Sequence, residues 1–306
     1  MNRTSLSASC LTAFLLAACA APGAEPAAAG KAPAESDVSF IPFSHLDLFW
    51  GGTREECLAR GCHLIAKAIR LGKQSPEFRF LLEDEVFVAN YLDSHRGSQE
   101  VEDLKRLVRS GQIEIAPKWA AIYQELPDGE AQVRNLAIGK RYAREVFGVD
   151  PQVAHLGDLP GYTPQYPQLL RQAGVPFMVM TRMGPADKSL FHWKSPDGSR
   201  VLAWSSLKSY AWGTFLHSRT SEERELERFR KDLADVRATT DAPILMHFGS
   251  DLWAPPDNLV EIVEQFNRKS PARLVFATPL EYFRRVASRP GIPEVSGEIP
   301  SSWPNL

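Results

Sequence analysis

Hydrophobic and polar residues alternate along this chain in two distinct ways. Short hydrophobic runs rich in β-branched and aromatic residues have the length of buried strands, and longer segments repeat hydrophobic residues at helical spacing. The first such strand starts at Val38 and leads into His45. Further strands are predicted at residues 78–82, 113–117, 153–156, 177–180, 244–248 and 274–277.

The helical segments fall between these strands. Gly148 and Gly174 stand where two of them should end, because glycine readily adopts the left-handed conformation that closes a helix. One hairpin interrupts the alternation, since Pro-Asp-Gly at 196–198 is strong turn chemistry between strands at 191–194 and 200–205. Helices are predicted at residues 54–73, 86–94, 99–110, 128–146, 163–173, 221–236, 258–269 and 279–287.

Strands that alternate with helices indicate a parallel sheet covered by helices. About seven βα units with one hairpin insertion predict an α/β fold, namely a seven-stranded parallel (β/α)7 barrel that forms a single domain over residues 38–306. An open doubly wound sheet is the alternative. Its usual glycine-rich first turn is missing, and Gly51-Gly52 is only a weak echo of it, so a nucleotide cofactor has little support.

Composition and charge are those of an ordinary globular protein. The chain has 306 residues, of which 44% are hydrophobic and 24% are charged, enough to bury one large core. The formal net charge of -2 provides no field that would attract a polyanion. We therefore expect no nucleic-acid partner.

The N-terminus has the pattern of an export signal. Arg3 precedes a short hydrophobic run at 11–18, and Leu-Ala-Ala-Cys at 16–19 resembles a bacterial lipobox. That resemblance implies a lipoprotein-type signal peptide at residues 1–19, with Cys19 as the lipidated residue and the only membrane anchor. An ordinary cleaved secretory signal with an incidental cysteine is the alternative.

The segment that follows the signal is consistent with a folded domain tethered outside the cytoplasm. Residues 20–37 are rich in alanine and proline, which is typical of a flexible linker. No later run approaches the roughly 20 apolar residues that span a membrane. Cys57 and Cys62 lie on different faces of a predicted helix, so no disulfide is expected between them. We predict an exported bacterial lipoprotein of the cell envelope, in the periplasm or at the cell surface.

The candidate chemistry lies where the predicted strands end. His45 and Asp47 are two residues apart, so in extended backbone both side chains leave from one face and are able to bind one divalent cation. A strand end followed by a helix cap is the alternative. In a parallel barrel the active site lies at the C-terminal ends of the strands. The other ligand-capable or aromatic side chains at such ends are Glu83, Asp84, Trp119, Asp158, Arg182 and Asp251.

Several motifs, taken in order, resemble the N-terminal catalytic domain of glycoside hydrolase family 38, the zinc-dependent retaining α-mannosidases. Phe-Ser-His-Leu-Asp-Leu-Phe-Trp at 43–50 is similar to the family's H-x-H-x-D-x-x-W. Gly-Asp-Leu-Pro-Gly at 157–161, followed by Pro-Gln-Leu-Leu at 167–170, is similar to its aspartate loop and the next helix. Further agreement lies at 111–115, 127–130, 147–149, 193–198 and 249–251, so the resemblance runs from about residue 39 to about residue 298.

The resemblance implies one zinc ion held by His45, Asp47 and Asp158. It also implies that Asp158 is the nucleophile and Asp251 the acid/base of a hydrolase acting on α-mannosidic or related α-glycosidic bonds in a glycan or oligosaccharide. A retaining glycosidase needs one carboxylate to attack the anomeric carbon and a second carboxyl about 5 Å away to protonate the leaving oxygen. The predicted substrate-binding residues are Trp50, Trp119 and Arg182.

These assignments have structural alternatives. Trp50 is almost as well explained as a packing residue at the end of the barrel, and Arg182 as the partner of a structural acid. The carboxylates at 83–85 are typical of the acidic first turn of a helix. Gly-Ser-Asp at 249–251 is also common helix-capping chemistry.

Two features depart from the family pattern. Phe43 replaces the first motif histidine, which is not a zinc ligand in the family. The family's fourth ligand is a histidine beyond the barrel, whereas this chain stops at Leu306, so we expect a chain truncated at its C-terminus. His155 and His247, in or beside predicted strands, are the histidines to test for that role.

Two other function classes stay open. A metal-dependent polysaccharide deacetylase-like hydrolase would use its metal to activate water, but the His-x-x-x-His pair expected of it does not occur in the sequence. The second class is a non-catalytic, lipid-anchored protein that binds sugar. Chelator sensitivity and the product released would separate the three classes.

Overall fold

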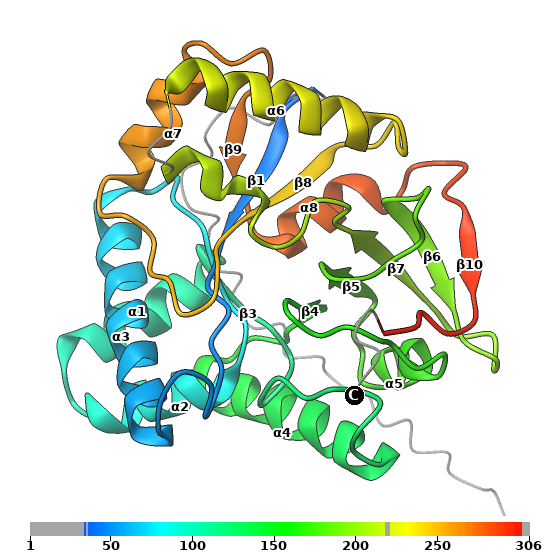
Figure 1. Cartoon of the computed structure of the whole chain (residues 1–306). Coiled ribbons are helices and arrows are strands. Elements are labelled where there is room, and N and C mark those ends of the chain that lie inside the picture. The colour runs from blue at the N-terminus through cyan, green and yellow to red at the C-terminus, as the bar shows by residue number, and fades with distance from the viewer. Residues whose placement is uncertain (1–33, 35, 218–220, 302–306) are drawn as a thin grey trace, which may run out of the picture.

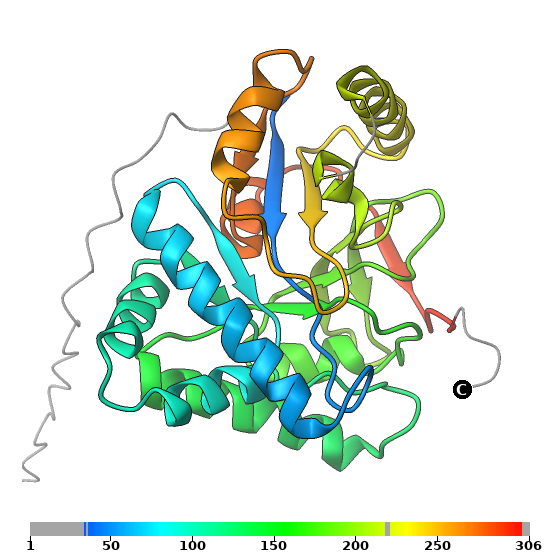
Figure 2. The same cartoon turned by 60° about the vertical axis from the view of Figure 1, so that its left-hand side comes forward.

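The computed structural model describes residues 34, 36–217 and 221–301 of the chain. The predicted signal peptide with Cys19, and nearly all of the linker, lie outside the described residues. In the described part, most strands lie in the interior with helices around them, whereas β6 (Leu190–Lys194) and β10 (Glu294–Ser296) lie at an outer edge (Figure 1). Figure 2 shows the same fold turned by 60°. Among these residues, no helix combines the length and the hydrophobicity needed to span a bilayer.

The strands form three separate sheets. The first has the order β8–β1–β9 and the second is the pair β2–β3, with all pairings parallel. The third has the order β10–β6–β7–β5–β4 and is parallel except for the β6–β7 hairpin. The strands are β1 (Val38–Pro42), β2 (Phe80–Leu82), β3 (Ile113–Ile115), β4 (Val153–Leu156), β5 (Phe177–Met180), β6 (Leu190–Lys194), β7 (Arg200–Ser205), β8 (Ile244–Phe248), β9 (Leu274–Phe276) and β10 (Glu294–Ser296).

The helices begin and end largely where the sequence predicts them. Thr53 opens α1 with a capping box, in which its side chain and that of Glu56 each accept a backbone N–H of the other residue. Gly148 closes α4 with a φ of +71°, the conformation that favours glycine. The helices are α1 (Arg54–Gln74), α2 (Glu85–Ser94), α3 (Gln99–Arg109), α4 (Gly129–Phe147), α5 (Tyr166–Gln172), the 3-10 helix η1 (Trp212–His217), α6 (Glu222–Arg237), α7 (Leu259–Asn267) and α8 (Pro279–Val286).

The strands do not close into the (β/α)7 barrel that the alternation predicts. Alternation identifies which segments are strands, whereas closure requires each strand to pair on both sides. Four of the strands, β2, β3, β9 and β10, are only three residues long, which leaves few ladder hydrogen bonds to join one sheet to the next. β6 and β10, the latter absent from the predicted strands, extend the third sheet outward from β7. The fold is therefore an α/β fold with mixed sheets.

The central strand β1 organises the interior. All five of its residues are buried, the pattern expected of a parallel strand covered on both faces. The ring of Phe40 lies 5.1 Å from that of Phe248 on β8 and 5.5 Å from that of Phe276 on β9. These ring contacts join the three strands, and several of the predicted site residues follow the C-terminal ends of β1 and β8.

Candidate active site

Backbone pairing continues beyond β1 and β8 and brings two predicted site residues together. The N–H of His45 donates to the carbonyl of Ser250 at 3.2 Å, and the N–H of Leu252 donates to the carbonyl of His45 at 2.8 Å. These bonds form a parallel bridge between His45 and Asp251. The histidine after the first strand therefore lies beside the aspartate after β8, although about two hundred residues separate them in the chain.

His45 is almost completely buried between two carboxylates. Its Nδ1 is 2.9 Å from Glu83 Oε2, and its Nε2 is 3.4 Å from Asp47 Oδ1. Burial alone would lower the pKa of His45, but the negative charges of Glu83 and Asp47 outweigh it and hold that pKa well above its ordinary value. The space beyond Nε2 is therefore suited to a positive charge, either a proton or a cation.

Glu83 and Asp84 share one buried lysine, Lys118, from the segment after β3. Its Nζ lies 3.3 Å from Glu83 Oε1 and 2.7 Å from Asp84 Oδ1. Burial would raise the pKa of Glu83, but the positive charges of Lys118 and His45 hold that pKa well below its ordinary value. Burial prevails at Asp84 and raises its pKa to about 6. Glu83 therefore meets His45 as an ionised carboxylate.

Two side chains connect the predicted nucleophile with the predicted acid/base. Arg182 Nε donates to Asp158 Oδ1, and Arg182 Nη2 lies 3.3 Å from the hydroxyl oxygen of Tyr210. That hydroxyl donates to Asp251 Oδ1 at 2.7 Å. The Tyr210 ring centroid also lies 6.0 Å from that of His45, so this chain of contacts borders the histidine. We call the series Asp158, Arg182, Tyr210 and Asp251 the carboxylate relay.

The sequence marks the aromatic segment at 210–215 as either a wall of a sugar pocket or a cover for the hairpin. Within it, Tyr210 is the member of the relay that is not among the predicted site residues. It follows β7 in a loop, and a loop position has no strand or helix periodicity that would mark it. Burial, followed by its hydrogen bond to Asp251, raises the pKa of Tyr210, so its hydroxyl remains a donor at neutral pH. The one available signal is the concentration of aromatic residues at 210–215.

Backbone strain also marks this region. Among the described residues, three that are not glycine have a positive φ: Phe49 at +73°, Ser209 at +80° and Leu252 at +57°. Such conformations cost of order 1–3 kcal/mol each and concentrate at functional sites. Each of the three has one candidate site residue as a chain neighbour, namely Trp50, Tyr210 and Asp251 respectively.

The two predicted sugar-binding tryptophans have different surroundings. Trp50 is 57% exposed, on the loop after Asp47, and Arg60 steadies that loop by donating to its carbonyl oxygen at 3.3 Å. The ring of Trp50 is therefore accessible to a ligand. Trp119 instead packs edge-on against Tyr142 of α4, with ring centroids 5.4 Å apart. The contact that the structure gives Trp119 is thus a packing contact.

His155 and His247, the two histidines singled out as possible ligands, form a buried pair. Their Nε2 atoms are 3.0 Å apart, and His155 Nδ1 lies 3.2 Å from Glu83 Oε1. The Phe43 ring covers the pair, 5.0 Å from the first imidazole and 5.5 Å from the second. Burial lowers the pKa of both rings and keeps them neutral. Phe43, which replaces the first motif histidine, is thus part of the core over these two rings.

A metal site is only partly formed in this structure. The described residues contain no group of three or more His, Cys, Asp or Glu side chains placed to hold an ion. Two predicted donors do converge, His45 Nε2 and Asp47 Oδ1, whereas Asp158 Oδ1 is engaged by Arg182. A lone pair on Nε2 and a carboxylate oxygen at 3.4 Å repel each other unless a proton or a cation lies between them, and nitrogen and oxygen donors of these types suit zinc. The donor chemistry therefore fits the predicted ion.

Asp158 and Asp47 both act electrostatically on Tyr123. Burial is the main influence that raises the pKa of Tyr123, and the negative charges of Asp158 and Asp47 add to it. The three predicted ligands do not meet as one group among the described residues, and Asp158 is bound to Arg182 instead.

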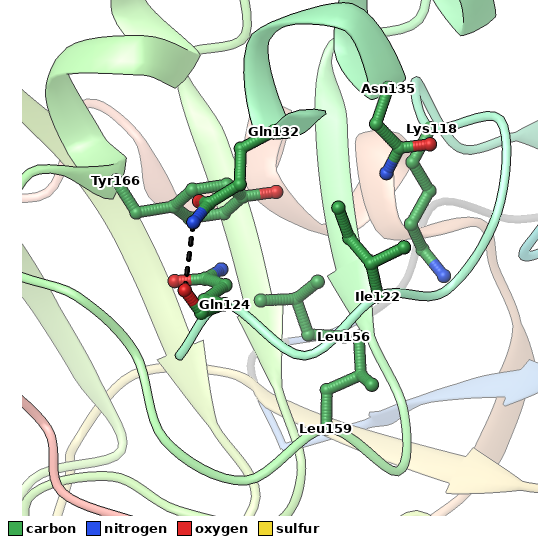
Figure 3. Close-up of a pocket in the computed structure, with 8 residues that line it drawn as sticks. All are labelled: Lys118, Ile122, Gln124, Gln132, Asn135, Leu156, Leu159 and Tyr166. Atoms are coloured by element: carbon green, nitrogen blue, oxygen red, sulfur yellow. Dashed lines mark hydrogen bonds between the residues drawn. The ribbon is translucent and has the colours of Figure 1, made fainter. Parts of the chain in front are cut away.

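A small internal cavity lies behind the Asp158 loop (Figure 3). Leu156 and Leu159 form its apolar wall, and Gln132 Nε2 donates to the carbonyl of Gln124 across it at 2.8 Å. Its volume of about 10 Å³ is the space of a single water molecule. The cavity is far too small for a sugar ring, so it is not the substrate site.

Glu85, which follows Glu83 and Asp84 in the chain, is expected to destabilise the fold at neutral pH. Its side chain is buried, and burial followed by the charge of Asp84 raises its pKa to about 9. Because the pKa of Glu85 is higher in the folded state, its contribution to stability is fully present below the unfolded pKa near 4.5. That contribution is lost as the pH rises through the folded pKa of about 9. Glu85→Gln should therefore stabilise the protein by ~1–3 kcal/mol at about pH 7.5 and by little at about pH 4.

Urea unfolding of both proteins at the two pH values measures this difference. The matched control is Glu55→Gln, because Glu55 also occupies a first helical turn but its side chain is 78% exposed. Glu55→Gln should lose a few tenths of a kcal/mol through the helix dipole, with no gain at the higher pH. Equal effects of the two substitutions would show that burial of Glu85 has no energetic consequence.

Comparison with known proteins identifies the family. The pattern described as "Glycosyl hydrolases family 38 N-terminal domain" matches residues 35–301. The chain belongs to glycoside hydrolase family 38. The resemblance carried by the motifs at 43–50 and 157–161 is therefore confirmed at the level of the family.

Relatives within family 38 are much longer than this chain. Alpha-mannosidase G of Dictyostelium discoideum is 22% identical over 251 residues, which are 79% of this chain and 22% of that protein. A putative mannosylglycerate hydrolase of Halalkalibacterium halodurans is 28% identical over 229 residues, 69% of this chain and 25% of that protein. The chain spans about a quarter of the length of these relatives.

Solved structures agree with the family assignment. The crystal structure of an alpha-mannosidase from Enterococcus faecalis V583 superposes with a TM-score of 0.75 at 22% identity. The match covers 86% of this chain and 30% of that one. At this identity the likeness shows a shared fold, and the chemistry has to be argued from the residues of the site.

Proposed function

We propose that this chain is the catalytic domain of a zinc-dependent retaining glycoside hydrolase that cleaves α-mannosidic bonds. The observation that carries the proposal is the carboxylate relay, in which Asp158 and Asp251 are linked through Arg182 and Tyr210 beside His45. Two carboxyl groups at one site are what glycoside hydrolysis requires. Membership of family 38 supports this reaction class, and the relatives' names support a mannoside as substrate.

The two carboxyl groups would act in two steps. In the first, the Asp158 carboxylate bonds to the anomeric carbon while Asp251 gives its proton to the leaving oxygen. In the second, Asp251 takes a proton from water, the water oxygen bonds to the same carbon, and Asp158 is released. Two inversions leave the configuration of the sugar unchanged.

Arg182 and Tyr210 would orient these groups. The guanidinium holds one oxygen of Asp158 and thereby fixes the direction of that carboxylate. Tyr210 donates to Asp251 Oδ1 and thereby fixes the direction of that carboxyl group. Exposed Trp50 offers an aromatic face on which a sugar ring is able to stack.

His45, Asp47 and Asp158 would hold one zinc ion. His45 offers Nε2, because its Nδ1 is occupied by Glu83, and the two aspartates offer carboxylate oxygens. When bound, the ion acts as a Lewis acid toward sugar hydroxyls and stabilises charge in the transition state. The convergence of His45 Nε2 and Asp47 Oδ1, 3.4 Å apart, supports this set of ligands.

We also propose where the protein acts. The lipobox-like sequence ending at Cys19 favours an exported bacterial lipoprotein, attached to the cell envelope by its N-terminus alone. The substrate would then be an α-mannoside-containing glycan or oligosaccharide in the periplasm or at the cell surface.

A direct assay tests the proposed reaction. The purified chain should release nitrophenol from an aryl α-mannoside, lose that activity to a chelator and regain it when zinc is added. Parallel reactions would contain mannosylglycerate, to test a small natural-type mannoside, and an acetylated glycan. Release of acetate without release of sugar would instead indicate a deacetylase. Chelator-insensitive binding of sugar with neither product would indicate a non-catalytic binding protein.

A further inference from the structure

The buried carboxylate of Glu83 contacts two segments that carry proposed site residues. One oxygen, Oε2, lies 2.9 Å from His45 Nδ1. The other oxygen, Oε1, accepts the backbone N–H of Gly157 at 2.8 Å. Gly157 directly precedes Asp158 in the chain. One side chain, at the end of β2, therefore connects the segment after β1 with the segment after β4.

We infer that Glu83 is a positioning residue that fixes the His45 imidazole and the Asp158 backbone relative to each other. The inference rests on the proposed function, because it concerns the same site and its zinc ligands. It adds a residue whose own atoms would touch neither metal nor sugar. Its effect would pass through Nδ1 of His45 on one side and through the Gly157 amide on the other.

The direction of the hydrogen bond to His45 follows from the charge on Glu83. Lys118 lies 3.3 Å from Glu83 Oε1, and an ionised carboxylate accepts hydrogen bonds without donating any. His45 must therefore carry a proton on Nδ1, and its Nε2 faces Asp47. A carboxylate that accepts from the far nitrogen of a ligand histidine fixes both its tautomer and its ring orientation.

Gly157 shows how closely Glu83 is fitted. A Cβ atom at Gly157 would lie 2.8 Å from Glu83 Oε1 and 3.0 Å from Oε2. Any larger residue would push the carboxylate away from the amide and from His45. The glycine before Asp158 is thus explained by the approach of an acid from another strand.

The oxygen Oε1 of Glu83 has two further neighbours besides the Gly157 amide, namely His155 and Lys118. His155 Nδ1 lies 3.2 Å from Oε1, and Lys118 is itself anchored by Asp84 at 2.7 Å. Positively charged or N–H-bearing groups therefore surround the carboxylate, so it cannot rotate away without leaving buried charges unpaired. This enclosure suits a residue that sets the position of others.

Glu83→Gln and Gly157→Ala test the inference, with Asp84→Asn as the matched control. Asp84 is a neighbouring buried carboxylate that shares Lys118, so its substitution removes a similar charge. The first measurement is nuclear magnetic resonance of the metal-free full chain, with histidine and glycine labelled by nitrogen-15. In the wild type, the His45 Nδ1–H and Gly157 N–H protons should resonate downfield and exchange slowly with water. Both signals should shift and exchange faster in Glu83→Gln, and remain in Asp84→Asn.

The second measurement is zinc affinity, determined by competition with a chromogenic chelator. Glu83→Gln and Gly157→Ala should each weaken zinc binding by about 10–100-fold, the usual effect of losing the partner of a ligand histidine. Asp84→Asn should weaken it by much less. Thermal unfolding of each variant shows whether a loss of affinity reflects a loss of fold, and the proton signals of the wild type test the contacts without any variant.

The outcomes separate this inference from the proposed function. If the His45 and Gly157 protons of the wild type exchange freely, or respond alike to Glu83→Gln and Asp84→Asn, the role of Glu83 is overturned. If these protons behave as expected but the wild-type chain binds no zinc, the zinc proposal fails while the positioning by Glu83 is supported. If the protons behave as expected and the wild-type chain binds zinc, both the positioning role of Glu83 and the zinc proposal are supported.

Discussion

Replacing Asp158 with asparagine is expected to lower kcat on aryl α-mannosides by about 10⁴-fold or more. The amide cannot form the covalent bond to the anomeric carbon on which a retaining mechanism depends. Asparagine also keeps the shape of the side chain, so the loss should appear without a comparable loss of fold. Steady-state kinetics with a nitrophenyl α-mannoside and thermal unfolding measure the two quantities.

The matched control for this change is Asp241→Asn, since the side chain of Asp241 is 96% exposed. Its kcat should equal that of the wild type. Arg182 loses a charged partner in the Asp158 variant, so Asp158→Glu provides a second comparison: it keeps the charge but moves the oxygens, and should also be strongly impaired. An Asp158→Asn protein with near wild-type turnover would exclude Asp158 as the nucleophile.

Asp251→Asn should lower kcat/KM by about 10²–10⁴-fold on mannosides with poor leaving groups, the usual contribution of a general acid. The loss should be much smaller for a dinitrophenyl mannoside, because that leaving group departs without a proton. Measuring kcat/KM over a series of aryl mannosides of graded phenol acidity therefore separates an acid/base role from a binding role. A loss that is the same for every leaving group would contradict the acid/base assignment.

A further comparison separates Asp251 from its partner Tyr210. Tyr210→Phe removes the hydroxyl that donates to Asp251 Oδ1 at 2.7 Å but leaves the carboxyl group in place. It should reduce activity less than Asp251→Asn and should retain the wild-type dependence on leaving group. Added azide should restore turnover of the activated mannoside in Asp251→Asn, because an anionic nucleophile needs no general base.

Most of the local structure is predictable from the sequence, because it depends on local rules. The helix at α4 ends at Gly148, and the hairpin of β6 and β7 turns at 196–198, as glycine and turn chemistry predict. Sheet closure is a different matter. It depends on pairing between segments far apart in the chain. The pattern of residues within β3 or within β4 does not indicate whether these two strands pair with each other.

The candidate site shows the same division. His45 and Asp251 are selected by their places after strands, and the structure brings them together in a backbone bridge. Glu83 appears in the sequence as one of three acidic residues at a helix start, and its contacts to His45 and Gly157 emerge only when three strand ends meet. Tyr210, in a loop, has no pattern to select it.

The contacts of Glu83 also constrain how this domain is able to diverge. Positions 45, 83 and 157 belong to three exchangeable βα segments, yet they meet at one carboxylate. Recombination that imports any one of these segments from a distant relative should succeed only when the incoming residue matches the other two. We therefore expect the three segments to be inherited as a unit, and an engineered chimera divided between them to fold but lose its alignment of histidine and aspartate.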